Sequence, residues 1–155
     1  MSSNGKHPVI IWIVGGFSNE VGTTPWDPAT PDNDQSGSAF HLAGVETMYP
    51  SLRGGNNNPG YLETCYGEVD DVIAAAQYLA KQPDVDAGSI YLGGHSTGGT
   101  LALLTAESTG MFRAVFAFGP VDDTANYGAD SVSYDVNDEN EVRLRAPKNF
   151  LGAVT

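Results

Sequence analysis

The feature that most constrains this chain is the segment Gly-His-Ser-Thr-Gly at residues 94–98. It fits the pattern G-x-S-x-G, in which a sharp turn between a strand and a helix lifts a serine above the end of the strand. The flanking residues agree with this context, because 89–93 are typical of a short buried strand and 100–104 of a buried helix. The pattern predicts that Ser96 is a nucleophile, which needs a general base beside it to react.

Strands and helices are predicted to alternate along the chain. Four apolar runs predict strands, at 8–14, 45–49, 89–93 and 112–118. Helices are expected at 38–43, 68–82 and 100–109, with two short ones at 139–145 and 147–151. Alternation of this kind predicts an α/β fold, a mostly parallel sheet of about four strands with helices on both faces. The loops after the strands should then meet at one edge of the sheet, where such folds bind ligands.

Length and composition narrow the range of partners. The 155 residues, 41% of them hydrophobic, predict one globular domain over 1–155. A formal net charge of -12 argues against nucleic acids and anionic membranes. No apolar run approaches the ~20 residues of a membrane span, and the polar start lacks the apolar core of a signal peptide. The expected location is therefore cytoplasmic. The single cysteine, Cys65, excludes an internal disulfide and supplies no zinc ligand set, so no metal or cofactor is expected.

Four local patterns carry a family resemblance. They are Val-Gly-Gly-Phe at 14–17, Tyr-Pro-Ser-Leu-Arg-Gly-Gly at 49–55, Tyr-Gly-Glu-Val-Asp-Asp at 66–71, and Gly-His-Ser-Thr-Gly-Gly at 94–99. In this order and spacing the sequence resembles the α/β-hydrolase superfamily, and within it the prolyl oligopeptidase-like serine hydrolases. The resemblance covers residues 8 to 155, and the serine turn is its most specific part.

The resemblance implies acyl transfer to water through a covalent acyl-enzyme on Ser96. The substrate would be a small-molecule ester or a peptide, and the residues leave open which of the two; transfer to an alcohol or amine would use the same groups. The oxyanion would be held by the backbone N–H of Thr97 and by a second N–H from the loop at Gly16 and Phe17. Related enzymes often carry His or Tyr where this chain has Val14, so side-chain help to the oxyanion is not expected there.

The chain departs from the family at its C-terminal end. Family members continue with two more strands, followed by the catalytic acid and the catalytic histidine respectively. The resemblance thus implies an incomplete hydrolase domain with an incomplete triad. The three histidines are poor substitutes for the missing base. His95 should point away from its neighbour Ser96, His7 precedes the first strand at the opposite end of the sheet, and His41 lies on a sheet face.

Three further residues are site candidates, and two of them have a second interpretation. Asp122 follows the fourth strand and is either a catalytic acid or a helix-capping carboxylate. Arg53 either anchors a substrate carboxylate or forms a structural ion pair. Trp26, in the long loop after the first strand, is a candidate for lining a substrate pocket.

A non-catalytic function is the alternative. If the last strands of the fold are missing, the strand at 112–118 exposes unpaired N–H and C=O groups, and such edges recruit partners. The chain would then act by self-association or partner binding. Whether or not the chain is catalytic, a homo-oligomer through this sheet edge is expected.

Overall fold

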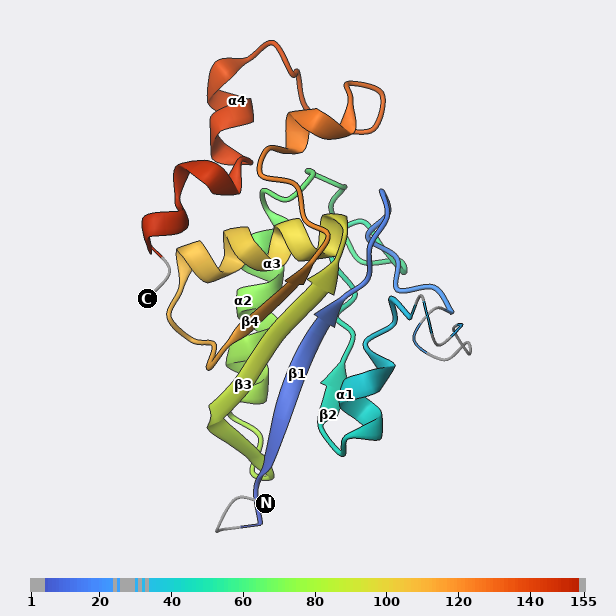
Figure 1. The fold of residues 1–155 in the computed structure, drawn as a ribbon, viewed down its shortest axis with the longest axis vertical. Coiled ribbons are helices and arrows are strands. Elements are labelled where there is room, and N and C mark those ends of the chain that lie inside the picture. Colours follow the sequence, from blue (N-terminus) through green and yellow to red (C-terminus); the bar gives the residue numbers. More distant parts are fainter. Residues whose placement is uncertain (1–4, 24, 26–29, 31, 33, 154–155) are drawn as a thin grey trace.

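A four-stranded parallel sheet forms the centre of the molecule. The computed structural model describes residues 5–23, 25, 30, 32 and 34–153. The strands lie in the order β2 (Glu46–Met48), β1 (His7–Ile13), β3 (Val85–His95) and β4 (Val115–Phe118). Each neighbouring pair is parallel, so all four strands end at the same edge (Figure 1). The predicted α/β architecture and the number of strands are confirmed.

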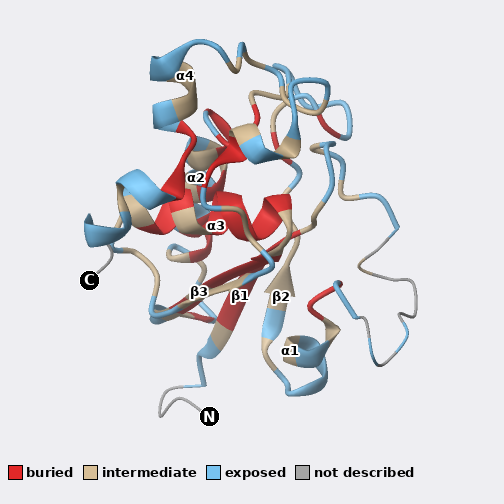
Figure 2. Ribbon diagram, turned by 45° about the horizontal axis from the view of Figure 1, so that its top comes forward, coloured by how far each residue is buried: buried red, intermediate tan, exposed pale blue. Residues whose placement is uncertain are grey.

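Helices cover both faces of the sheet. The helices α2 (Glu68–Leu79) and α3 (Thr97–Ser108) pack together against one face. Ile11 and Ile13 of β1 belong to a buried cluster with residues of both helices. Figure 2 shows buried residues in the strands at the centre of the sheet and in the helices packed on them. The intervening Trp12 lies on the opposite face, as alternation along a strand requires. There its ring lies 5.6 Å from Phe40 of the short helix α1 (Ser38–Leu42).

Several boundaries differ from the sequence prediction. β3 begins at Val85 rather than 89, because buried Val85 pairs with His7 before an irregularity in the register. β4 begins at 115 rather than 112, since its regular pairing with β3 begins only at Val115. α2 ends at Leu79, and the following N–H groups of Lys81 and Gln82 donate three residues back, as in a tightened last turn.

Residues 119–153, which follow β4, lie beyond the carboxyl ends of the strands and along α3 (Figure 1). They contain α4 (Glu139–Leu144) and the 3₁₀ helices η1 (Thr124–Tyr127), η2 (Pro147–Asn149) and η3 (Leu151–Ala153). The helix expected at 139–145 is thus confirmed, whereas that expected at 147–151 is divided into two short 3₁₀ turns. No helix in the described part of the chain is long and apolar enough to cross a membrane.

Candidate active site

Ser96 lies at the junction of β3 and α3, with a backbone that few residues adopt. Its φ is 56° and its ψ is -122°. The flanking glycines explain how the turn is accommodated. A Cβ on Gly94 would lie 2.5 Å from the backbone of Gly98, and a Cβ on Gly98 would lie 2.3 Å from the carbonyl oxygen of Ile13. Strained serines of this kind cluster at functional sites, and the strand–turn–helix context predicted from 94–98 is present.

The residue after Ser96 joins the elbow to the loop that follows β1, here called the β1 loop (residues 14–21). The Thr97 hydroxyl donates to the carbonyl of Gly16 (2.6 Å) and accepts from the Gly16 N–H (2.9 Å). Thr100 makes the first backbone bond of α3, from its N–H to the Ser96 carbonyl (3.0 Å). The Thr97 N–H therefore lies among the helix-start donors that have no partner within the helix. This arrangement is compatible with Thr97 as an oxyanion donor, which stays a prediction.

Within the β1 loop, Gly16 and Phe17 differ in their availability. Because the Gly16 N–H already donates to Thr97, it would have to exchange that bond to bind an oxyanion. A Cβ on Gly15 would lie 2.6 Å from the His95 carbonyl oxygen, so the loop passes directly over the elbow. The predicted second donor is thus better matched by Phe17 than by Gly16.

Tyr127 is a site residue that the sequence interpretation missed. Its hydroxyl shares a hydrogen bond with Thr100 (2.9 Å) and lies within hydrogen-bonding reach of the Ser96 side chain. Burial raises the pKa of Tyr127, so the phenol stays protonated and able to donate. Its ring meets that of Phe17 edge to face, with 5.3 Å between centroids. No sequence motif marks Tyr127, because only the fold of η1 brings it back to the elbow.

The three histidines lie in two different places on the molecule. His7 pairs with Val85 at the start of β3, the end of the sheet opposite Ser96. His41 and His7 line one surface hollow at that same end. His95 lines a cavity of about 430 Å³ with Trp12 and Phe118, on the aromatic face of the sheet. That none of them serves as the base stays a prediction.

The two aspartates after β4 have different environments. Asp122 is exposed and accepts from the Asn126 amide (3.2 Å). Asp123 is buried, caps η1 by accepting from the Ala125 N–H (3.0 Å), and pairs with Lys148 (2.6 Å). Burial alone would raise the pKa of Asp123, but the hydrogen bonds from Lys148 and from the Ala125 N–H, together with the positive charge of Lys148, outweigh it and lower the value. The capping role considered for Asp122 thus belongs to Asp123, and a catalytic role for Asp122 stays a prediction.

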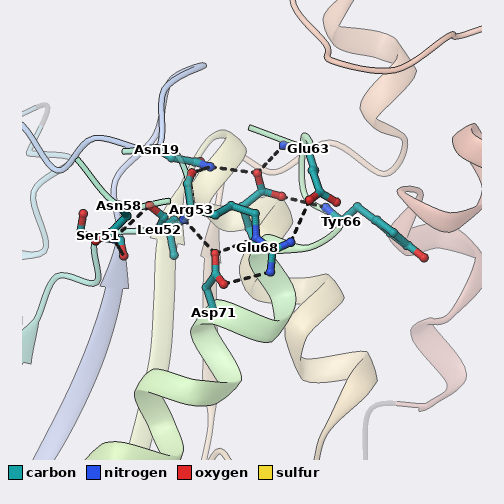
Figure 3. A network of polar contacts seen from close by, with 9 residues as sticks. All are labelled: Asn19, Ser51, Leu52, Arg53, Asn58, Glu63, Tyr66, Glu68 and Asp71. Carbon is teal, nitrogen blue, oxygen red and sulfur yellow. Dashed lines mark hydrogen bonds and ion pairs between the residues drawn. The ribbon is translucent and has the colours of Figure 1, made fainter. Parts of the chain in front are cut away.

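Arg53 is engaged by carboxylates of its own chain (Figure 3). Its Nε and one terminal nitrogen each donate to Asp71 (both 3.0 Å), and the other terminal nitrogen donates to Glu63 (2.8 Å). The hydrogen bonds that the guanidinium donates to Asp71 raise its pKa further. Burial alone would raise the pKa of Asp71, but the bonds from Arg53 lower it. The structural ion pair, one of the two interpretations of Arg53, is therefore present. Its role in substrate binding stays a prediction.

Two other polar groups lie beneath the site. Glu68 is 1% exposed and accepts from the backbone N–H groups of Glu63 (2.7 Å) and Tyr66 (3.1 Å). Cys65 is a buried free thiol that donates to the Thr97 carbonyl (3.8 Å), and burial raises its pKa to about 12. A thiol with such a pKa is an inert packing group at neutral pH.

Trp26 lies outside the described residues, so its predicted role in lining a pocket stays a prediction. Among the residues that the structure does describe, no group of three or more His, Cys, Asp or Glu side chains is placed to hold a metal ion.

Comparison with known proteins agrees with this geometry. The prolyl oligopeptidase family matches residues 35–150. A search of curated proteins by sequence found no match. Prolyl oligopeptidase B from Galerina marginata is 25% identical, with a TM-score of 0.68 over 94% of this chain and 22% of that one.

Two other solved structures share the fold. A puromycin-hydrolyzing peptidase from Mycobacterium tuberculosis is 20% identical, with a TM-score of 0.74 over 96% of this chain and 24% of that one. Dipeptidyl peptidase 4 from Porphyromonas gingivalis is 19% identical, with a TM-score of 0.71 over 97% of this chain and 22% of that one. The chain thus spans less than a quarter of each of these three structures. With a family match over most of its length and the elbow in place, the chain belongs to the prolyl oligopeptidase family of α/β-hydrolases.

Proposed function

We propose that Ser96 is the nucleophile of a serine hydrolase that cleaves an ester or peptide bond through an acyl-enzyme. The observation that carries this proposal is the strained backbone of Ser96, held between Gly94 and Gly98 at the start of α3. Such a turn costs about 1–3 kcal/mol, which a purely structural connection would not require. Family membership supports peptides as the substrate class.

The proposed reaction uses a nucleophile and oxyanion donors from this chain and a base from outside it. Ser96 Oγ would attack the carbonyl carbon, and the C–N or C–O bond to the leaving group would break from the tetrahedral intermediate. The N–H groups of Thr97 and Phe17 would hold the oxyanion, each contributing about 2.7–4 kcal/mol of barrier reduction. Water would then hydrolyse the acyl-enzyme. A base must accept the proton of Ser96, and a histidine base would come from outside these 155 residues, because His7, His41 and His95 lie elsewhere.

Covalent labelling tests this proposal. The folded chain is incubated with a fluorophosphonate probe and the adduct is located by peptide mass mapping. We expect one adduct, on Ser96, and none in Ser96→Ala. Ser108→Ala is a matched control, because Ser108 lies at the other end of α3 and its hydroxyl donates to the Leu104 carbonyl. Absence of a Ser96 adduct in a folded sample that also contains imidazole as a soluble base would sink the proposal.

A second function, self-association, is favoured by the position of β4. In the described residues β4 pairs only with β3, so its outer side is a sheet edge. Phe118 on this strand is 49% exposed. A strand with one unpaired side can add a strand from another copy of the chain. Light scattering over a concentration series tests this: we expect a dimer or larger oligomer, and a monomer at high concentration would contradict it.

A further inference from the structure

We propose that Asn19 is a positioning residue for the oxyanion site, because its side chain fixes the part of the β1 loop that carries the Phe17 N–H. The inference rests on the proposed function, since it concerns where that N–H lies relative to Ser96.

The side-chain amide of Asn19 links the β1 loop to two other segments (Figure 3). Its Nδ2 donates to the carbonyl of Arg53 (2.7 Å) and to Oε1 of Glu68 (2.9 Å). Both acceptors are themselves fixed. The backbone N–H of Arg53 donates to Asp71 (2.9 Å), and Glu68 is almost fully buried at the start of α2. Asn19 therefore binds to a rigid support, and both of its amide hydrogens are used.

The backbone around Asn19 is held as closely as its side chain. A Cβ on Gly55 would lie 2.1 Å from the Asn19 carbonyl oxygen, so only glycine permits this approach. The Val21 N–H donates to Oδ1 of Asn56 (2.8 Å). The distal end of the β1 loop is thus packed and hydrogen-bonded against the loop at 50–60.

The proximal end of the β1 loop is fixed separately. There the backbone of Gly16 exchanges two hydrogen bonds with the Thr97 hydroxyl. Phe17 and Ser18 consequently lie between two fixed points, one at the elbow and one at Asn19. An N–H that stabilises a developing charge is effective only if it is already in place before the charge forms. The Asn19 amide supplies the second of the two fixed points.

Asn19→Ala is the variant that tests this role, with Asn58→Ala as its matched control. Asn58 also donates from Nδ2 to two backbone carbonyls, of Ser51 (2.8 Å) and Leu52 (3.3 Å), and neither of these bonds involves the β1 loop. The readout is the amide ¹⁵N order parameter of Phe17 and Ser18, measured by NMR. We expect about 0.85 in the unmodified chain and in Asn58→Ala, and below about 0.6 in Asn19→Ala.

Labelling kinetics provide the second readout. We expect Asn19→Ala to slow the formation of the covalent bond between the fluorophosphonate and Ser96 roughly tenfold or more. The affinity of the reversible complex that precedes this bond should stay unchanged. Asn19→Asp keeps the side-chain shape but removes the donor, so it should show the same defect.

Each outcome is decisive. Order parameters in Asn19→Ala that match those of Asn58→Ala overturn the positioning role, and so does a loss of order throughout the chain, because the residue would then be structural only. If the unmodified chain is not labelled at Ser96, the proposed function fails, and the order parameters still decide whether Asn19 fixes the loop.

Discussion

Gly98 is the residue at which the elbow is packed most closely against the sheet. An added methyl group would lie 2.3 Å from the carbonyl oxygen of Ile13, which is backbone and cannot turn aside. We expect Gly98→Ala to lower the free energy of unfolding by about 1–3 kcal/mol, as overpacking does. Gly110→Ala is the control, because nothing lies within 4 Å of its added Cβ. Denaturant unfolding measures both, and equal stabilities of the two variants would contradict this account of the turn.

Glu107 on α3 has a carboxylate in surroundings that disfavour its charged form. Both of its oxygens are buried without a hydrogen-bond partner among the described residues, and burial raises its pKa to about 7. Since the folded state holds the proton more tightly than the unfolded chain, stability should fall as the pH rises from about 4.5 to about 7. Glu107→Gln cannot lose a proton. We therefore expect the unfolding free energy of the unmodified chain, relative to this variant, to decrease across that window. A constant difference from pH 4.5 to 7 would show that Glu107 does not titrate abnormally.

At the residue scale, the sequence was most informative where chemistry needs a fixed spacing. The pattern at 94–98 predicted the turn at Ser96 because the two glycines are required by close backbone approach. Tyr127 and Asn19 could not be found in this way. Each reaches its partners through tertiary contacts across at least 27 residues of sequence, and neither belongs to a local pattern.

At the scale of the elements, Arg145 is a buried cation at the end of α4 that connects this helix to the rest of the molecule. The Arg145 guanidinium lies 4.7 Å from the ring centroid of Tyr66 and 4.6 Å from that of Tyr134. It also donates to the Glu63 carbonyl (2.9 Å) and to the Glu141 carboxylate (2.6 Å). Arg145 therefore connects the segment after β4 to the loop that leads into α2.

Loss of this cation should destabilise the molecule. We expect Arg145→Met to reduce the free energy of unfolding by about 3 kcal/mol, because it leaves a buried carbonyl and a carboxylate without their donor. Arg143→Met, on the exposed side of α4, should change it by less than about 0.5 kcal/mol. Urea unfolding followed by circular dichroism measures both values. If the two variants have the same free energy of unfolding, the contacts of Arg145 with Tyr66 and Tyr134 do not anchor α4.

Strands and helices were predicted well where a periodic apolar pattern is long enough to be read. The 3.6-residue spacing of Val72, Ala76 and Leu79 identified α2, and all three are buried. The ends were predicted less accurately because tertiary pairing determines them. Val85 joins β3 only through its contact with His7, which no local pattern encodes.

At the scale of the whole molecule, the open side of β4 is the surface through which we propose that the chain associates. The Phe118 carbonyl faces β3, where it accepts from the Ser96 N–H (2.8 Å). Because successive peptide groups of a strand alternate in direction, the N–H of Ala117 points outward. We expect Ala117→Pro to weaken self-association while leaving the monomer folded, since proline is tolerated on an edge strand. Sedimentation velocity tests this.

Salt provides an independent check on the same surface. The net charge of -12 makes identical chains repel one another. Association should therefore strengthen between low and physiological salt, as screening increases. Unchanged association in both Ala117→Pro and high salt would show that the sheet edge is not the contact surface.

We propose that this chain presents a preorganised nucleophile and oxyanion site at Ser96 and that the base comes from outside these 155 residues. The most direct test measures the rate of fluorophosphonate bonding to Ser96 with increasing concentrations of imidazole, a soluble substitute for the missing histidine. We predict that bonding is slow without imidazole, rises with its concentration, and is absent in Ser96→Ala. A bonding rate that does not change with imidazole concentration, or bonding that persists in Ser96→Ala, would contradict the account.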